Sequence, residues 1–285
     1  MKDALRLMRI PFSVYLMPIF WFALSAQPAF EVWRAVAVFF ILHLLVYPAS
    51  NGYNSYFDRD EVSIGGLKHP PRVTKTLFRL VLVFDLLALL AAASLSLAFG
   101  ACILVYLLVS KAYSYDKIRL KKYPWLSTLV VVVFQGAFTF LMVQLGVNLN
   151  YQLIFSPGNL VLAGVSSLFL CGSYPLTQIY QHAEDSRRGD QTLSLILGIR
   201  GTLVFAALSL LLATCLLLLA YGKQQEYRNI YIFLLCTAPV LAFFSSWVLK
   251  IRRDPAQANF ENTMRMNQIS SLSISLAFGL ILFTS

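Results

Sequence analysis

The chain has 285 residues and a formal net charge of +10, and 58% of its residues are hydrophobic whereas only 13% are charged. The charged share is about half that of an ordinary soluble domain, and long uncharged runs recur along the chain, which excludes a soluble protein. The positive charge is explained below by membrane orientation, so we expect no nucleic-acid partner. We predict one all-α integral membrane domain over residues 1–285.

Apolar stretches near 20 residues are long enough to cross a bilayer as helices. The sequence contains nine such stretches, so we predict a bundle of nine transmembrane helices. The predicted spans are 10–26, 32–50, 76–92, 95–112, 126–145, 159–177, 201–220, 230–249 and 267–284.

The basic residues predict the orientation of this bundle. If the N-terminus lies inside and the helices alternate, every Lys and Arg falls on the inner side except Arg34, Lys223 and Arg228. An excess of inner positive charge is what orients helical membrane proteins. The N-terminal run resembles a signal peptide, but further spans follow it, so we expect it to remain as the first helix. The four cysteines lie in apolar runs without metal-binding spacing and predict neither a disulfide framework nor a zinc site.

A polar pattern of twelve residues occurs twice, at 47–58 and 174–185, and each copy ends a long apolar run. Tyr, Pro, Tyr and Asp recur at identical offsets in the two copies. The second and sixth predicted helices have the same orientation and are four helices apart. We therefore expect an internal duplication of a four-helix unit, with the ninth helix added, and one site shared by the two copies.

Within each copy, oxygen-bearing side chains stand at positions i, i+3 and i+7, which share one face of a helix. The proline near the start of each copy should kink or loosen the helix. The two faces are Asn51, Asn54 and Asp58 in the first copy, and Gln178, Gln181 and Asp185 in the second.

Oxygen ligands without a Cys or His cluster suit a hard cation such as Mg²⁺, which normally binds together with a substrate phosphate. Basic residues in the inner loops suit the same anionic partner. The pattern thus favours a diphosphate bridged by Mg²⁺ between Asp58 and Asp185. The plainer alternative is that both Asp residues merely end helices in the headgroup region. The basic loop residues are Lys117, Arg119, Lys121, Lys122, Arg187 and Arg188.

These residues resemble the UbiA-type intramembrane prenyltransferase superfamily. That family has nine transmembrane helices and two acidic motifs after helices 2 and 6, Asn-Asp-x-x-Asp-x-x-x-Asp and Asp-x-x-x-Asp. The resemblance implies an Mg²⁺-dependent transferase that moves a polyprenyl group from its diphosphate to an aromatic, quinone-precursor or other lipophilic acceptor. It also implies a multi-pass integral membrane protein whose partners include membrane lipid. We expect it in a bacterial inner membrane, with the active site on the cytoplasmic face.

Both motifs depart from the family pattern. In the first, Ser55 and Val62 stand where Asp is usual, and Asp60 and Glu61 could substitute only if the helix ends early. In the second, Gln181 replaces the first Asp, and Glu184 could compensate. Fewer carboxylates imply weaker Mg²⁺ binding, or a larger share for Lys and Arg in holding the diphosphate.

The resemblance assigns roles to residues of this chain. The expected catalytic residues are Asn54, Asp58, Gln181 and Asp185. The expected metal ligands are Asn54, Asp58, Glu184 and Asp185. The expected diphosphate-binding residues are Asn51, Lys117, Arg119, Lys121, Gln178 and Arg187. The residues expected to stabilise an allylic cation or line the acceptor pocket are Tyr53, Asp85, Tyr115 and Tyr180. Asp85 has an equal alternative, as a protonated carboxyl hydrogen-bonded between helices.

Two other functions stay open at this point. One is a relative of the family that has lost transfer chemistry or uses another phosphorylated donor, because motif carboxylates are missing. The other is a transporter, in which paired kinked polar helices would form a substrate path. A transporter should carry polar residues through to the outer face, whereas here they crowd the inner end.

Overall fold

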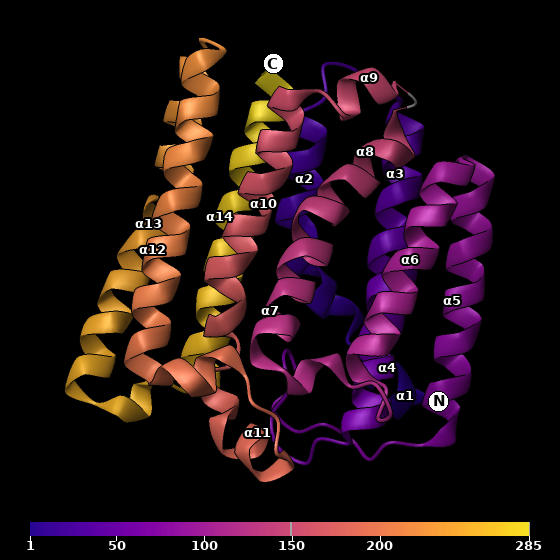
Figure 1. Cartoon of the computed structure of the whole chain (residues 1–285), viewed down its shortest axis with the longest axis vertical. Helices are drawn as coiled ribbons and strands as arrows, with labels where there is room; N and C mark the ends of the chain where they lie inside the picture. The colour runs from indigo at the N-terminus through magenta and orange to yellow at the C-terminus, as the bar shows by residue number, and fades with distance from the viewer. Residues whose placement is uncertain (149, 285) are drawn as a thin grey trace.

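The computed structural model describes residues 1–148 and 150–284. Within these ranges the secondary structure is helical, apart from one isolated bridge between Ile64 and Leu67. Nine helical segments of the described residues are long and apolar enough to cross a membrane (Figure 1). The nine predicted spans are therefore confirmed, and most helices extend beyond the predicted limits.

The nine segments comprise several shorter elements. The first contains α1 (Lys2–Leu7), η1 (Ile10–Leu16) and α2 (Met17–Ser25), and the second α3 (Val32–Phe40), η2 (Ile41–Val46) and α4 (Tyr47–Asp58). The third and fourth are α5 (Lys75–Leu95) and α6 (Leu97–Ser114), and η3 (Leu120–Lys122) follows them. The fifth contains α7 (Pro124–Val132), η4 (Val133–Phe138) and α8 (Thr139–Val147), followed by the short α9 (Tyr151–Ile154). The remaining elements are α10 (Pro157–Leu176), η5 (Ile179–Gln181), α11 (His182–Arg188), α12 (Leu193–Lys223), α13 (Tyr227–Arg253), η6 (Pro255–Gln257) and α14 (Phe260–Thr284).

The two copies of the repeated pattern lie at the same end of the bundle. Figure 1 shows α4, α11 and the N-terminus at this end, and α9 and the C-terminus at the other. We call the end with α4 and α11 the polar end. Its assignment to the cytoplasm and the internal duplication stay predictions.

The second segment loosens where the sequence places Pro48. A π-helical turn, Ile41–Val46, lies directly before α4, and Pro48 is in the first turn of α4. Proline has no N–H to donate to the preceding turn, so the regular α-helical ladder cannot continue through it. α4 then runs to Asp58, with Asn51, Asn54 and Asp58 on the side that faces the cavity described below.

The sixth segment differs from the prediction. The shared face of residues 178, 181 and 185 was expected on one continuous helix, but α10 ends at Leu176, near Pro175. The backbone N–H groups of Thr177 and Gln178 bond to carbonyls three residues earlier, at 3.0 and 3.1 Å, which tightens the chain into a turn. The 3₁₀-helix η5 and the separate helix α11 follow. The expectation of a continuous helix is therefore wrong, because the chain turns after the proline instead of extending α10.

Aromatic packing closes the bundle between its first and last segments. Phe22 of α2 stacks on Phe278 of α14 with ring centroids 4.2 Å apart, and Phe140 of α8 contacts Phe22 edge to face. All three rings are buried. On the outside, leucines such as Leu208 and Leu235 are exposed along α12 and α13, as expected for side chains that face lipid.

Candidate active site

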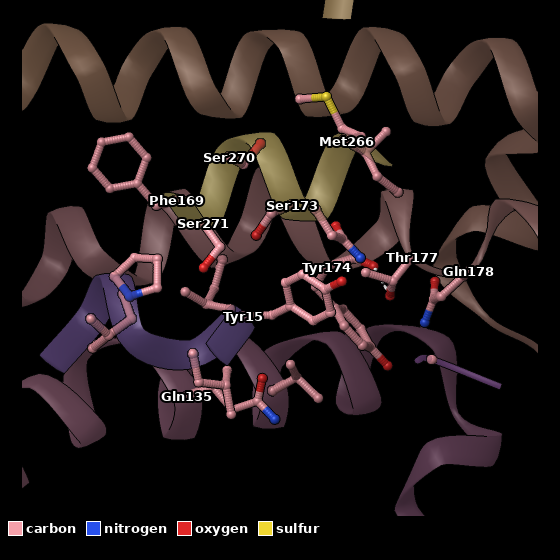
Figure 2. Close-up of a pocket in the computed structure, with 18 of the residues that line it drawn as sticks. Tyr15, Gln135, Phe169, Ser173, Tyr174, Thr177, Gln178, Met266, Ser270 and Ser271 are labelled. Atoms are coloured by element: carbon pink, nitrogen blue, oxygen red, sulfur yellow. Dashed lines mark hydrogen bonds between the residues drawn. The ribbon is translucent and has the colours of Figure 1, made fainter. Parts of the chain in front are cut away.

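One cavity of about 720 Å³ extends from the polar end into the bundle and is lined by both copies of the repeated pattern. The first copy contributes Ser50, Asn51, Asn54 and Asp58, and the second contributes Tyr174, Leu176, Thr177, Gln178, Tyr180, Gln181 and Asp185. The charged lining residues are Arg9, Asp58, Asp60, Lys121, Asp185, Arg188 and Asp190. Figure 2 shows the uncharged part of the wall, where Tyr15, Gln135, Ser173, Thr177 and Ser270 surround the same space.

Asp58 lies at the centre of a cluster of cations. Its Oδ1 atom forms an ion pair with the Lys121 ammonium, and it lies 3.8 Å from the Arg119 guanidinium and 4.0 Å from that of Arg188. Asp58 is buried, so these charges interact in a medium less polar than water. The last residue of α4 is therefore held by cations from α11 and from the loop between the fourth and fifth segments, residues 115–123, called the 4–5 loop.

Asp190, in the turn that follows the second copy, anchors the same cations. Arg119 donates Nε–H and Nη2–H to the two Asp190 carboxylate oxygens, at 3.0 and 2.8 Å. This hydrogen bonding raises the pKa of Arg119 despite its partial burial. Lys121 lies 3.9 Å from Asp190. Because Arg119 and Lys121 each approach both Asp58 and Asp190, they connect the end of the first copy electrostatically to the turn after the second.

Two residues with a left-handed backbone conformation end α4 and α11, and the chain that follows each of them brings a further carboxylate into the cavity lining. Arg59 has φ 50° and ends α4, so the chain turns and Asp60 lines the cavity. Gly189 has φ 72° and ends α11, and the N–H of Asp190 bonds to the Asp185 carbonyl at 3.0 Å. A glycine adopts this conformation at little cost and commonly ends helices in this way. The helix thus ends early enough for Asp60 to substitute in the first motif, whereas Glu61 and Val62 are exposed.

Asp60 and Asp185 have different surroundings. The Asp60 carboxylate lies 3.0 Å from Arg188, but burial, followed by the charge of Asp58, raises the pKa of Asp60 to about 6. The Oδ2 atom of Asp185 is buried without a hydrogen-bond partner among the described residues. An orphaned carboxylate oxygen in a cavity is a group that a bound cation or donor would satisfy.

The amide side chains of the two copies are partly committed to the protein. Asn54 donates from Nδ2 to the Ser114 hydroxyl at 3.0 Å, so its carbonyl oxygen is the atom left to bind a cation. The Oε1 atom of Gln178 accepts from the Ser194 N–H at 3.3 Å and holds the start of α12. Two tyrosines of the lining, Tyr113 and Tyr174, are joined through their hydroxyls at 2.6 Å.

Several residues expected at the site lie elsewhere. Lys117 and Arg187 are exposed, and Glu184 is buried beside Arg188 at 3.5 Å. None of the three lines the cavity, as far as the described residues show. Arg119 also lies behind the lining, where it binds Asp190.

Three residues expected to line the acceptor pocket form a separate cluster. Asp85 pairs with Lys111 at 2.5 Å, and the Lys111 ammonium lies 5.0 Å from the centre of the Tyr53 ring. Tyr115 packs edge to face on Phe57. Asp85 therefore lies between helices α5 and α6 against Lys111, as in the second alternative considered from the sequence, and outside the cavity lining among the described residues. Of the expected aromatic residues, Tyr180 does line the cavity.

Sequence reasoning gave no site role to Arg9, Asp190 or Thr192, all of which line the cavity. For Asp190 a signal was present, because Gly189 directly precedes it and marks a helix end that turns the chain back. Arg9 and Thr192 carried no such local signal, because their places depend on how the first and seventh segments pack.

The donor types fit Mg²⁺ only when the ion shares ligands with a bound molecule. Within the described residues, no group of three or more His, Cys, Asp or Glu side chains is close enough to hold a metal ion unaided. Nevertheless, the unpartnered Asp185 oxygen, the Asn54 carbonyl oxygen and Asp58 offer oxygen ligands along one cavity. Mg²⁺ keeps several waters and often binds through one or two carboxylates plus phosphate oxygens, which suits this sparse set.

A family model for the UbiA prenyltransferase family matches residues 15–269 of the chain. The chain belongs to the UbiA prenyltransferase family. No curated protein sequence matches it significantly.

Solved structures with the UbiA fold cover nearly the whole chain. A UbiA homologue from Archaeoglobus fulgidus bound to GPP and Mg²⁺ has a TM-score of 0.63 and 19% identity, and the match covers 98% of this chain and 99% of that one. The apo UbiA homologue from Aeropyrum pernix K1 has a TM-score of 0.69 and 15% identity, with 96% and 98% covered. A structure described as digeranylgeranylglyceryl phosphate synthase matches at 0.63 and 18% identity, with 100% and 99% covered. These likenesses show that the nine-segment bundle is the UbiA fold.

Proposed function

We propose that this UbiA-family protein transfers a polyprenyl group from its diphosphate to a lipophilic acceptor within the membrane. One observation carries the proposal. A single cavity has charged side chains at the polar end and apolar or uncharged walls along the rest of its length. A prenyl diphosphate has the same division, with a compact anionic head and a long hydrocarbon tail.

The cations at the polar end supply the binding site for the diphosphate. Lys121 and Arg188 line the cavity. Arg119 lies outside the lining among the described residues and forms ion pairs with Asp58 and Asp190, the same carboxylates that Lys121 approaches. Arg188 takes the place expected for Lys117 and Arg187, which are exposed. Guanidinium and ammonium groups bind phosphate oxygens through charge-assisted hydrogen bonds, and here they would stabilise negative charge on the departing diphosphate.

Mg²⁺ would be held by Asn54, Asp58 and Asp185, with Gln181 beside them in the lining. When bound, the ion supplies additional positive charge to the diphosphate oxygens. Relatives of the same fold have been solved with GPP or DMAPP and Mg²⁺, which supports this cofactor here. Glu184, expected as a fourth ligand, lies outside the cavity lining among the described residues and pairs with Arg188 at 3.5 Å. Asp60 takes its place as the additional nearby carboxylate.

The remaining lining suits the reaction of the prenyl group. As the bond to the diphosphate breaks, the allylic carbon becomes cation-like, and the rings of Tyr180, Tyr113 and Tyr174 lie along the cavity where they can face it. Apolar residues further in, such as Phe169 and Phe233, exclude water that would quench the cation. An aromatic acceptor such as a quinone precursor fits this environment.

The transporter alternative is disfavoured by the part of the cavity that lies deepest in the bundle, farthest from the polar end. Phe22, Phe233 and Phe278 line it, and the Phe22 and Phe278 rings are stacked 4.2 Å apart. A polar substrate path would need hydrogen-bonding groups in that region.

The test uses purified protein in lipid nanodiscs with a radiolabelled prenyl diphosphate, Mg²⁺ and a lipid extract as the source of acceptors. We expect diphosphate release and a labelled lipid product, both reduced in Asp185→Asn. Mass spectrometry of membrane lipids and quinones with and without the gene identifies the product in cells. Tight donor binding without any product from any extract would instead support a relative that has lost transfer chemistry.

A further inference from the structure

His182 is a polar side chain beside the site to which the proposed function gives no role. It is the first residue of α11 and is half-buried, and it lies outside the cavity lining among the described residues. Its Nε2 atom lies 2.7 Å from the Ser194 hydroxyl in the first turn of α12. This hydrogen bond connects the helix that carries Asp185 to the helix that follows it.

Ser194 is fully buried and joins several polar groups. Its hydroxyl lies 3.0 Å from the Thr202 hydroxyl, which is also fully buried. Its backbone N–H donates to the Gln178 side-chain oxygen at 3.3 Å. Two residues of the second copy, Gln178 and His182, therefore meet at one serine. A buried polar group costs free energy unless it is hydrogen-bonded, so these contacts hold Ser194 in one position.

The first turn of α12 needs such contacts because the helix is interrupted directly after it. Gly198 has φ 64° and ψ 172°, which is not a helical conformation, and glycine adopts it at little cost. The Thr202 hydroxyl lies across the interruption, 2.8 Å from the Gly198 carbonyl oxygen and 3.2 Å from that of Ser194. The turn that contains Ser194 is thereby fixed to the membrane-spanning part of α12, and His182 attaches α11 to that turn.

The orientation of α11 depends on contacts of this kind. The helix has 7 residues, and a helix of this length is not stable without tertiary contacts. At its C-terminal end, Arg188 pairs with Asp60 at 3.0 Å. At its N-terminal end, His182 bonds to Ser194. Asp185 lies one turn after His182, between these two attachments, and lines the cavity with its Oδ2 atom unpartnered among the described residues.

We propose that His182 is a positioning residue: its bond to Ser194 fixes α11 on α12, so that the free oxygen of Asp185 faces the Mg²⁺ ion. The inference rests on the proposed function and adds a residue that acts on the metal site without touching the ion or the donor. Groups that orient the ligands of a metal ion commonly change its affinity by roughly tenfold or more. Loss of the His182 contact should leave the cations of the diphosphate site in place, because Lys121 and Arg188 keep their carboxylate partners.

The experiment measures two affinities of the detergent-purified full chain by calorimetry. One is the binding of geranyl diphosphate at increasing Mg²⁺, and the other is the binding of inorganic diphosphate in EDTA. We expect His182→Leu to raise the Mg²⁺ concentration for half-maximal donor binding by roughly tenfold and to leave diphosphate affinity in EDTA within about twofold. Ser194→Ala should raise the Mg²⁺ requirement as well. His182→Gln should retain most of the parent's behaviour, because the Gln amide can still hydrogen-bond to Ser194.

Two double variants separate positioning from a general loss of structure. If His182 acts through Ser194, His182→Leu combined with Ser194→Ala should have no larger effect than either change alone. If it acts through Asp185, His182→Leu should cause no further shift in the Asp185→Asn background. His69→Leu is the matched control, because His69 is exposed in the loop 59–72 at the same end of the bundle and should bind like the parent.

Chromatography in detergent checks folding, and Ser194→Ala compared with His182→Gln decides the question if His182→Leu does not fold. An unchanged Mg²⁺ requirement in folded His182→Leu overturns the proposal, as does an equal loss of diphosphate affinity in EDTA or a further shift in the Asp185→Asn background. Failure of the parent to bind geranyl diphosphate at any Mg²⁺ concentration would instead contradict the proposed transfer function.

Discussion

Arg119 and Asp190 form a two-pronged ion pair, with hydrogen bonds of 3.0 and 2.8 Å between the guanidinium and the carboxylate. The pair joins the 4–5 loop to the turn after α11. It also places Arg119 3.8 Å from Asp58, the last residue of the first copy. The two halves of the charged site are therefore fixed to each other by one planar group.

Arg119→Lys should weaken donor binding although it keeps the charge, because an ammonium cannot make two parallel hydrogen bonds to Asp190. We expect roughly a tenfold loss of affinity for a prenyl diphosphate, measured by calorimetry. Lys117→Gln, which changes an exposed residue of the same loop, should bind like the parent. Equal affinities for Arg119→Lys and the parent would show that the fork geometry is irrelevant.

Asp58→Asn should have opposite effects with and without Mg²⁺. Without the metal, the variant frees Lys121, Arg119 and Arg188 from their shared carboxylate, so inorganic diphosphate should bind more tightly than to the parent. With Mg²⁺, it should bind a prenyl diphosphate more weakly, because a metal ligand is lost. Asp185→Asn should show only the second effect, since no salt bridge is found for Asp185 in the described residues. Titrations of diphosphate with Mg²⁺ or with EDTA separate the two effects, and a Mg²⁺-independent loss in both variants would contradict a shared metal site.

Introducing Asp at the two motif positions that lack it, 62 and 181, should affect Mg²⁺ binding differently. Gln181 lines the cavity, whereas Val62 is 44% exposed and lies outside the lining within the described residues. Gln181→Asp should therefore lower the Mg²⁺ concentration needed for half-maximal donor binding, and Val62→Asp should leave it unchanged. A Mg²⁺ titration of donor binding tests both. A shift caused by Val62→Asp alone would mean that the first motif reaches the metal through position 62 after all.

Asp60 should make the protein less stable as the pH rises. Its pKa is raised to about 6 from an ordinary 3.8, mainly by burial, so the native state binds the proton more tightly than the unfolded chain. The resulting stability is present below about pH 4 and is lost as the pH rises to about 6. Asp60→Asn should therefore gain thermal stability relative to the parent between these values.

The measurement for Asp60 is the difference in melting temperature between variant and parent at several pH values from 4 to 7.5, without Mg²⁺. Asp3→Asn changes an exposed carboxylate and is the control. A difference that stays flat across this range would show that Asp60 titrates normally in the folded protein.

The membrane orientation is tested with reporters in two loops. Loop 59–72 follows α4 at the polar end, whereas α9, within the loop 147–158, lies at the opposite end of the bundle (Figure 1). Because almost all basic residues flank the polar end, a reporter in loop 59–72 should be cytoplasmic and one in loop 147–158 external. Both reporters on one side of the membrane would contradict the nine-span topology.

The sequence by itself determined the nine spans, because a backbone in lipid must satisfy its own hydrogen bonds and long apolar runs can do so only as helices. It also placed both polar patterns at one end, since two helices four apart in an alternating bundle point the same way. The face shared by Asn51, Asn54 and Asp58 followed from helical spacing alone and is the face that lines the cavity.

Only the tertiary structure decided which other residues meet there. The spans are apolar all round, because lipid-facing and interior side chains are equally hydrophobic, so no periodicity told which side of α5 or α6 faces inward. The sequence therefore did not indicate that Asp85 and Tyr53 lie with Lys111, outside the cavity lining among the described residues. The break after Pro175 and the left-handed residues Arg59 and Gly189 redirected the chain locally. Arg9 reached the cavity because the first segment packs against the loop 59–72, a contact between residues far apart in sequence that no local pattern encodes.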